Sequence, residues 1–172
     1  MKPLNECIAV YRAEMQKGEL PRAYRGIIDY MLMLRSHLRK KYPGLSVSGN
    51  FYQGYMDMTF FSMVPVTFEG HRLKIALVFN HERMAFEAWL SAVNKEVQAE
   101  YLEQFRKENW PDYRIPPSPQ GYDSILECDL ATDPDFDNQD LLSGQMEKEL
   151  WKFIGEVERF LYKTENRQVS FK

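Results

Sequence analysis

Cysteine, histidine and long apolar runs are all scarce in this chain of 172 residues, which contains only two cysteines and three histidines. Cys7 and Cys128 are far apart, and no two histidines stand at metal-ligand spacing, so neither a disulfide framework nor a metal site is expected. No stretch approaches the roughly 20 apolar residues that a bilayer-spanning helix needs. The N-terminus, MKPLNECIAVYRAEM, lacks the pattern of a secretory signal. We therefore expect a cytoplasmic protein without a membrane partner.

The signature motifs of common enzymes are also missing. The sequence has no glycine-rich phosphate loop, no Gly-x-Ser-x-Gly elbow, and no Glu-x-Lys or Asp-x-Lys of the kind found in metal-dependent nucleases. Its net charge is −3, from 22 basic and 25 acidic residues, which provides no overall field to attract nucleic acid. We predict no cofactor, no bound metal and no catalytic residue, and nucleic acid is not expected as a partner.

The composition is that of a globular protein, with 44% hydrophobic, 27% charged and an unusually high 14% aromatic residues. A chain of this length can bury roughly 70% of its unfolded surface around one core. We therefore predict a single domain over residues 1–172, with residues 164–172 as a flexible tail.

Hydrophobic residues recur at helical spacing in four segments. The first stops at Gly18 and the second runs from Pro21 to Tyr42, which together predict an αα-hairpin. The third covers residues 92–109, and the fourth is a C-terminal helix that includes Met146 to Leu161.

Alternation with a period of two marks the strands, and turn residues separate them. The first alternating stretch is too long for one strand and is expected to break at Gln53-Gly54. The predicted strands are residues 46–53, 55–64, 72–79, 84–90 and 124–130. The expected order is ααββββαβα. This is an α+β fold in which an antiparallel β-meander of four to five strands carries helices on one face.

The only resemblance to a known family is carried by four segments: YQGYMDMTFF, LKIALVF, FEAWLSAVNKEVQ and PDFD. With these motifs the chain resembles an uncharacterised bacterial family known only as a domain of unknown function, over nearly its whole length. The resemblance implies a single cytoplasmic domain. It implies no activity and assigns no catalytic residue.

The hairpin register predicts which side chains share a face of the sheet. A four-residue turn at positions 80–83 would pair Phe79 with Met84 and Leu77 with Phe86, on a wholly apolar face packed against the helices. Three residues of the preceding strand should join this core face: Met58, Phe60 and Val64. The opposite face should then carry a mixture of aromatic, polar and charged residues: Asp57, Thr59, Phe61, Met63, Lys74, Glu87 and Trp89.

Two interpretations of that opposite face remain open. It could be an ordinary solvated surface on which Lys74 and Glu87 form a diagonal ion pair. Alternatively, aromatic residues could wall a concavity closed by the proline-rich connector, WPDYRIPPSPQG (residues 110–121), with a few charged groups inside it. The candidate ligand-binding residues are Tyr55, Asp57, Phe61, Lys74, Glu87 and Trp89. The partner would be an unknown small ligand or another protein.

A non-catalytic binding or adaptor module that uses this face is the favoured function. The alternative is a metal-dependent hydrolase or nuclease-like enzyme in which Asp57 and Glu87 hold the cation. Asp57 itself is predicted to be exposed beside Thr59, held by a neighbouring side chain or by a backbone amide near Gly54.

An acidic cluster, DPDFDNQD, precedes the last helix. A calcium loop would need glycine at its sixth position and glutamate at its twelfth, where this chain has Asn138 and Gly144. We interpret Asp137 or Asn138 as the N-cap of the helix instead.

Overall fold

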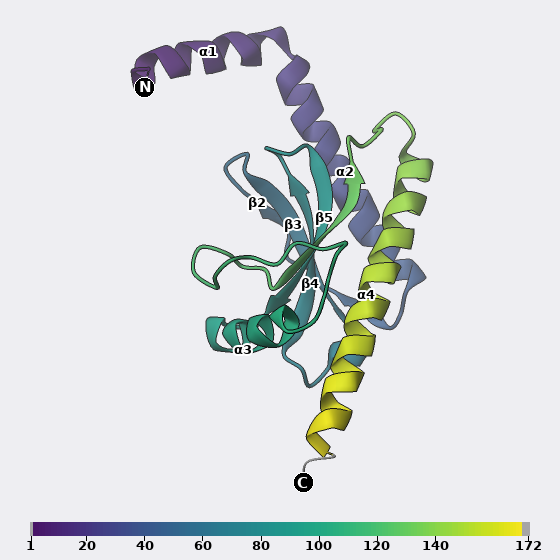
Figure 1. Cartoon of the computed structure of the whole chain (residues 1–172). Helices are drawn as coiled ribbons and strands as arrows, with labels where there is room; N and C mark the ends of the chain where they lie inside the picture. The colour runs from purple at the N-terminus through teal and green to yellow at the C-terminus, as the bar shows by residue number, and fades with distance from the viewer. Residues whose placement is uncertain (1, 170–172) are drawn as a thin grey trace. The chain divides into compact units, whose positions relative to one another are not determined.

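The structure, a computed structural model, describes residues 2–169 and divides the chain into two compact units, residues 1–37 and 38–172. Figure 1 labels the helices and strands in chain order. Within the described residues, no helix is both long enough and apolar enough to cross a membrane. That the whole chain forms one domain stays a prediction.

Two helices open the chain, as predicted. Helix α1 (Leu4–Lys17) ends at Gly18, whose φ of 83° lets its N–H reach the carbonyl of Met15, and α2 (Glu19–Lys41) follows. A packed hairpin buries one face of each helix, yet α1 contains no buried residue. The expected αα-hairpin is therefore corrected to two successive helices, and the apolar side of α1 is exposed.

The unit of residues 38–172 is built on a six-stranded antiparallel sheet with the path β1-β3-β4-β5-β6, while β2 also pairs with β3. The strands are β1 (Leu45–Val47), β2 (Tyr52–Gln53), β3 (Met58–Pro65), β4 (Leu73–Asn80), β5 (Ala85–Ala92) and β6 (Leu126–Thr132). The predicted strand 46–53 is broken into β1 and β2, because the amide of Asn50 bonds the Ser48 hydroxyl in a local turn. The order is thus ααβββββαβα, an α+β fold as expected.

Three helical segments complete this unit: η1 (Val66–Phe68), α3 (Lys95–Arg106) and α4 (Gln139–Val169). The side chain of Asn94 caps α3 by accepting a hydrogen bond from the amide of Val97 at 2.9 Å. Helix α4 begins directly after Asn138 and reaches Val169, so residues 164–169 of the predicted tail are helical. The last three residues, 170–172, lie outside the described part, and the flexibility of the tail stays a prediction.

The core of this unit lies between the sheet and α4, which contacts β5 and β6 and runs beside them in Figure 1. The α4 residues buried there are Met146, Leu150, Phe153, Ile154 and Val157. The strand residues that share the core face of β5 and β6 include Phe86, Ala88, Leu90, Leu126 and Cys128. Burial of each large apolar side chain contributes about 1.5–3 kcal/mol to stability.

The β4–β5 hairpin differs from its predicted register by two residues. The four-residue turn is His81–Met84 rather than residues 80–83, and Met84, at φ 48°, is exposed outside the strand. Phe79 consequently pairs with Phe86. A shift of two residues preserves the side on which each side chain points, so the apolar face predicted for β4 and β5 is confirmed.

The facing of β3 was predicted wrongly. Phe61 pairs with Leu77 and is 1% exposed, which places it on the core side together with the buried Thr59 and Met63. Three residues predicted for the core lie on the other side and are partly exposed: Met58, Phe60 and Val64.

We call the side of the sheet away from the core the Trp89 face. Strand pairing assigns to it, from β3 to β6, Met58, Phe60, Ser62, Lys74, Ala76, Val78, Glu87, Trp89, Ser91, Glu127 and Asp129. Helices were predicted on one face of the sheet only, but α3 begins beside the Trp89 face. Further along, α3 contacts α4, where the rings of Phe105 and Phe160 lie at a centroid distance of 4.1 Å. One side of the sheet is therefore packed by α4, and the other is left partly open.

Candidate binding site on the Trp89 face

A cavity of about 300 Å³ opens on the Trp89 face. This volume lies at the lower end of the roughly 300–1,000 Å³ typical of small-molecule pockets. Its apolar lining from the strands is Met58, Phe60, Ala76, Trp89 and Ala92, and its polar lining from the strands is Ser62, Lys74 and Ser91. Its rim includes Asn94, Lys95 and Gln98 at the start of α3, and Asp123, which follows the connector.

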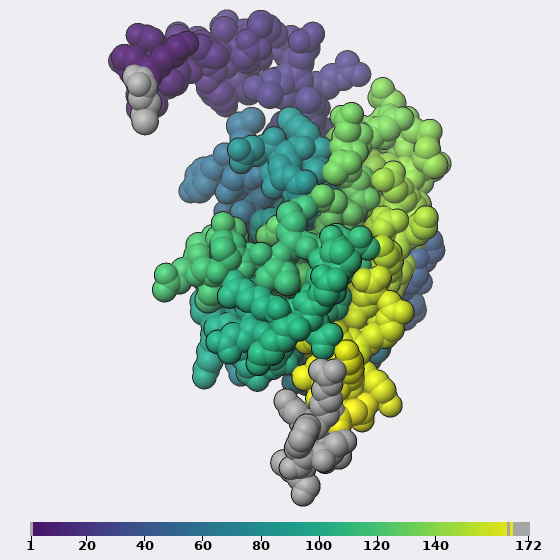
Figure 2. Space-filling view, viewed as in Figure 1, coloured from purple at the N-terminus to yellow at the C-terminus, as the bar shows by residue number. Residues whose placement is uncertain are grey.

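Hydrogen bonds from α3 hold this rim in place. Lys95 Nζ contacts Asp123 Oδ1 at 2.9 Å and also donates to the carbonyls of Pro119 and Tyr122. The Gln98 amide, on a side chain that is almost fully buried, donates to the carbonyls of Tyr122 and Ser124 at 2.9 Å each. In the space-filling view, α3 and the chain that follows it form one continuous surface (Figure 2). The edge of the cavity is thus a fixed structure.

The aromatic wall is fixed from below by a buried carboxylate. Trp89 Nε1 donates to Glu87 Oε2 at 2.6 Å, and Glu87 is only 1% exposed. The other Glu87 oxygen accepts hydrogen bonds from Arg83 and, at 3.4 Å, from Asn80. Arg114 adds an ion pair to Oε2 at 3.4 Å. The Trp89 ring is thereby held in one orientation.

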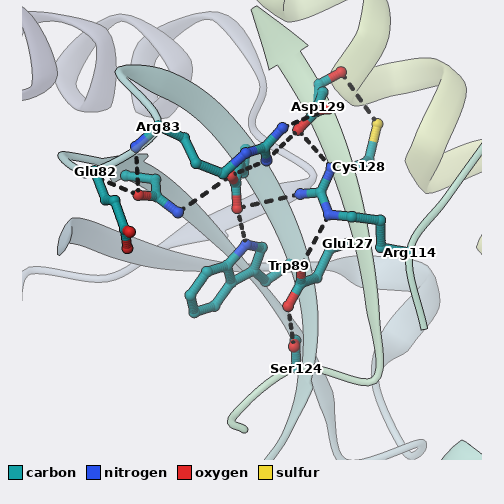
Figure 3. A network of polar contacts seen from close by, with 10 residues as sticks. Glu82, Arg83, Trp89, Arg114, Ser124, Glu127, Cys128 and Asp129 are labelled. Atoms are coloured by element: carbon teal, nitrogen blue, oxygen red, sulfur yellow. Dashed lines mark hydrogen bonds and ion pairs between the residues drawn. The ribbon is translucent and has the colours of Figure 1, made fainter. Parts of the chain in front are cut away.

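Glu87 belongs to what we call the arginine–carboxylate network, formed by Arg83, Glu87, Arg114, Glu127 and Asp129. Figure 3 shows how Arg83, Arg114, Glu127 and Asp129 lie around Trp89. Arg83 binds Asp129 through two parallel contacts of 2.8 and 3.1 Å, and Arg114 contacts Asp129 at 2.8 Å and Glu127 at 3.3 Å. A register shift after Phe86 places Asp129 opposite Glu87. Glu87, Glu127 and Asp129 each have an arginine partner, which offsets the cost of removing these carboxylates from water.

These contacts shift pKa values within the network. The hydrogen bond from Arg83 is the main cause that holds the pKa of Asp129 below its ordinary value, against the opposing effect of burial. Partial burial would lower the pKa of Arg114, but the hydrogen bond to Asp129 and the charges of Asp129 and Glu87 raise it. These contacts favour the charged forms of Asp129 and Arg114, and the network supports Trp89 through Glu87.

The structure brings together three of the six candidate residues. Lys74 and Trp89 line the cavity, and Glu87 lies beneath Trp89. The expected diagonal ion pair between Lys74 and Glu87 is wrong, because Glu87 is paired with Arg83 and Arg114. Three candidates lie elsewhere: Phe61 is in the core, Tyr55 is 96% exposed outside the cavity lining, and Asp57 lies in the bend before β3. The connector was expected to close the concavity, but only its neighbour Asp123 lines it.

Asp57 has a local structural role. Its Oδ1 accepts a hydrogen bond from the amide of Met58 at 2.7 Å, which is the main cause that lowers the pKa of this carboxyl group. The expectation that Asp57 is exposed and held by a backbone amide near Gly54 is confirmed. Its expected place beside Thr59 is wrong, since Thr59 is buried on the core side and its hydroxyl lies 2.9 Å from His81 Nε2.

The metal-site alternative finds no support in this geometry. Among residues 2–169, no three histidine, cysteine, aspartate or glutamate side chains gather in a way that could hold a metal ion. Both oxygens of Glu87 already accept hydrogen bonds, from Trp89 and from Arg83. A cation placed there would have to displace these donors and would be repelled by two arginines.

The sequence did not reveal Arg83, Arg114, Asp129 or Phe60 as parts of this site. Arg83 belongs to the turn before β5, and Arg114 to the connector, where no periodicity indicates the direction of a side chain. The one available signal was the spacing of Arg83 and Glu87. At this spacing, an arginine in a hairpin turn can form an ion pair with a glutamate on the strand that follows the turn. Phe60 was missed because the wrong facing of β3 placed it in the core.

Comparison with known proteins identifies a family to which no activity is assigned. The family described as Domain of unknown function (DUF7000) matches residues 4–161, so the chain belongs to this family. The predicted resemblance to a domain of unknown function over nearly the whole chain is thereby confirmed. No curated protein and no solved structure gave a match.

Proposed function

We propose that this protein is a non-catalytic binding module whose cavity on the Trp89 face takes a small ligand. The observation that supports this most is the composition of the cavity, in which a large apolar wall of Trp89 and Phe60 is combined with a few polar groups. Aromatic surface supplies affinity through burial, and sparse polar groups orient a ligand. An adaptor role, with a side chain of a protein partner in the cavity, would use the same surface.

Preorganisation also favours binding. Trp89 is held by Glu87, which is itself held by Arg83 and Arg114, so a ligand would not have to order this ring. The rim is similarly fixed by Lys95. A site whose side chains are already immobilised loses less entropy when it binds.

The lining offers little to a chemical reaction. The cavity residues include no histidine and no cysteine, so the hydroxyls of Ser62 and Ser91 have no imidazole base within the lining. Asp123 is engaged with Lys95. Binding therefore accounts for these residues better than catalysis does.

We also propose a cytoplasmic setting for this function. Cys7 is exposed and Cys128 is buried, and both are free thiols. Free thiols are typical of a reducing compartment.

A fragment screen tests the binding proposal. We would record the indole N–H signals of the three tryptophans by NMR and assign the Trp89 signal with the Trp89→Phe variant. We expect a group of fragments that shifts the Trp89 signal and loses binding in Ala76→Leu, which fills the cavity from its wall. The control is Ala13→Leu on the exposed surface of α1. A library that leaves Trp89 unmoved, or hits that survive Ala76→Leu in a folded variant, would contradict the proposal.

A further inference from the structure

We infer that the ligand of this cavity is a small flat acid, with its carboxylate bound by Lys74 and its apolar part against Trp89. This inference rests on the proposed function, because it assumes that the cavity takes a ligand. It adds the charge of that ligand and the residues that recognise it.

Lys74 provides the only uncompensated charge among the residues that line the cavity. The lining contains two lysines and one aspartate, and Lys95 is paired with Asp123 at 2.9 Å. Within the described part of the chain, no hydrogen bond or ion pair joins the Lys74 ammonium group to another residue, although the residue is half-buried. A partly desolvated ammonium group without a counter-charge attracts an anion more strongly than an exposed lysine does.

Ser91 supplies a hydroxyl beside this charge. It lies directly across from Lys74 in the β4–β5 pairing, and both residues line the cavity. Ser91 is only 5% exposed as a whole residue, and it contributes to the wall of the cavity. A hydroxyl group in the cavity wall can donate a hydrogen bond to a ligand oxygen that lies beside Lys74.

The start of α3 adds to the same electrostatic field. Asn94 and Lys95 bring the first turn of this 12-residue helix to the rim of the cavity. The positive end of the helix dipole favours a negative group near it. One lysine and one hydroxyl match a singly charged carboxylate, whereas a phosphate dianion usually takes more donors or a glycine-rich loop.

The other half of the cavity suits an apolar ring. Ala76 pairs with Trp89 across the two strands, and its small side chain leaves depth beside the indole. Phe60 lies on the same face one strand further along. A flat group can stack between these aromatic residues while its acid group points toward Lys74.

The test compares three probes with the same naphthalene ring on the full chain: 2-naphthoate, 2-naphthamide and 2-naphthyl phosphate. Affinity is measured by titration of the Trp89 indole signal. We expect 2-naphthoate to bind about tenfold more tightly than the amide, and its affinity to fall as salt is added. We expect the phosphate to bind more weakly than the carboxylate. In Lys74→Met the acid should lose about tenfold in affinity and the amide less than about twofold. The matched control is Lys148→Met on α4, an exposed lysine outside the cavity lining.

The possible failures separate the inference from the proposed function. Equal affinity for acid and amide, or an equal loss of both in Lys74→Met, would overturn the acidic ligand while the cavity still binds. Tighter binding of the phosphate would overturn the carboxylate. No response of Trp89 to any of the three probes would overturn the inference, and the fragment screen would then decide on the binding function by itself.

Discussion

Trp89 and Glu87 are joined by a hydrogen bond of 2.6 Å between the indole nitrogen and a carboxylate that is 1% exposed. The two residues are two positions apart on β5 and therefore point to the same side of the sheet. The carboxylate is compensated by Arg83 from the preceding turn and by Arg114 from the connector. A change at Glu87 therefore alters contacts in three segments of the chain: β5, the turn before it and the connector.

Glu87→Gln should lower the free energy of unfolding by about 1.5–3 kcal/mol, the range for loss of a hydrogen bond to a charged group. The variant keeps the shape of the side chain but leaves Arg83 and Arg114 without one negative partner. Urea denaturation measures the loss. Glu103→Gln, on the exposed side of α3, is the control and should be neutral. A stability equal to that of the wild type would mean that the network does not depend on this charge.

Acid should weaken the protein partly through Asp129. Since Arg83 holds the pKa of Asp129 below its ordinary value of 3.8, the unfolded chain takes up this proton at a higher pH than the folded chain. The stabilisation is present above pH 3.8 and is lost as the pH falls through the lower, folded pKa. Thermal melts at about pH 5 and about pH 3 should show a smaller drop in Tm for Asp129→Asn than for the wild type. The exposed Asp140→Asn should keep the wild-type drop.

Phe86→Ala should cost about 3–5 kcal/mol of unfolding free energy, because it empties a core position. Phe86 is fully buried and contacts Phe79 at a centroid distance of 4.9 Å. Tyr55→Ala removes an equally large ring that is 96% exposed, and it should change stability by less than about 0.5 kcal/mol. Urea melts of both variants provide the comparison, and a loss below about 1 kcal/mol at Phe86 would contradict its place in the core.

Gly54→Ala should destabilise the bend before β3 by about 1–3 kcal/mol. A Cβ atom at this position would lie 2.0 Å from Asp57 Oδ1 and 2.7 Å from the carbonyl oxygen of Met58. The Asp57 side chain can move aside, but the Met58 carbonyl belongs to the backbone and cannot move without disturbing β3. Gly49→Ala is the matched control, since its Cβ would meet no atom within 4 Å. Equal unfolding midpoints for the two variants would refute this account.

Asp57→Asn should fold normally and leave the urea midpoint close to that of the wild type. The asparagine oxygen can still accept the hydrogen bond from the amide of Met58, and the lost charge is exposed. The same variant should keep the affinity for 2-naphthoate, because Asp57 does not line the cavity. A variant that does not fold, or that binds the acid differently, would show that Asp57 has a larger role.

The fold was largely predictable because helix and strand periods are strong local signals. The facing of β4 and β5 was predicted correctly despite a misplaced turn, since the turn moved by one residue and the pairing by two. The facing of β3 could not be read in the same way. In MTFFSMV both alternating sets contain large apolar residues, and the set with polar Thr59 is the buried one, where His81 satisfies its hydroxyl.

The candidate site was predictable only in part. Lys74 and Trp89 were found because strand parity alone places them on one face. The two arginines were not, because a turn and an irregular connector carry no period from which to deduce direction. Burial of Glu87 was equally hidden, since a buried acid is recognised only when its partners are known.

The order of the strands along the chain also has a kinetic consequence. Strands β3, β4 and β5 are joined by short turns, whereas β6 reaches the sheet only after residues 93–125 have been traversed. Closing a short loop loses less chain entropy, so the three-stranded meander should assemble early and β6 should dock late. Two acids of the site belong to β6 itself, Glu127 and Asp129. Arg114 and Asp123 lie in the segment that precedes β6, so they take their places only when this strand docks. During synthesis, Trp89 and Lys74 would therefore lie on an incomplete sheet until residues 126–132 have emerged.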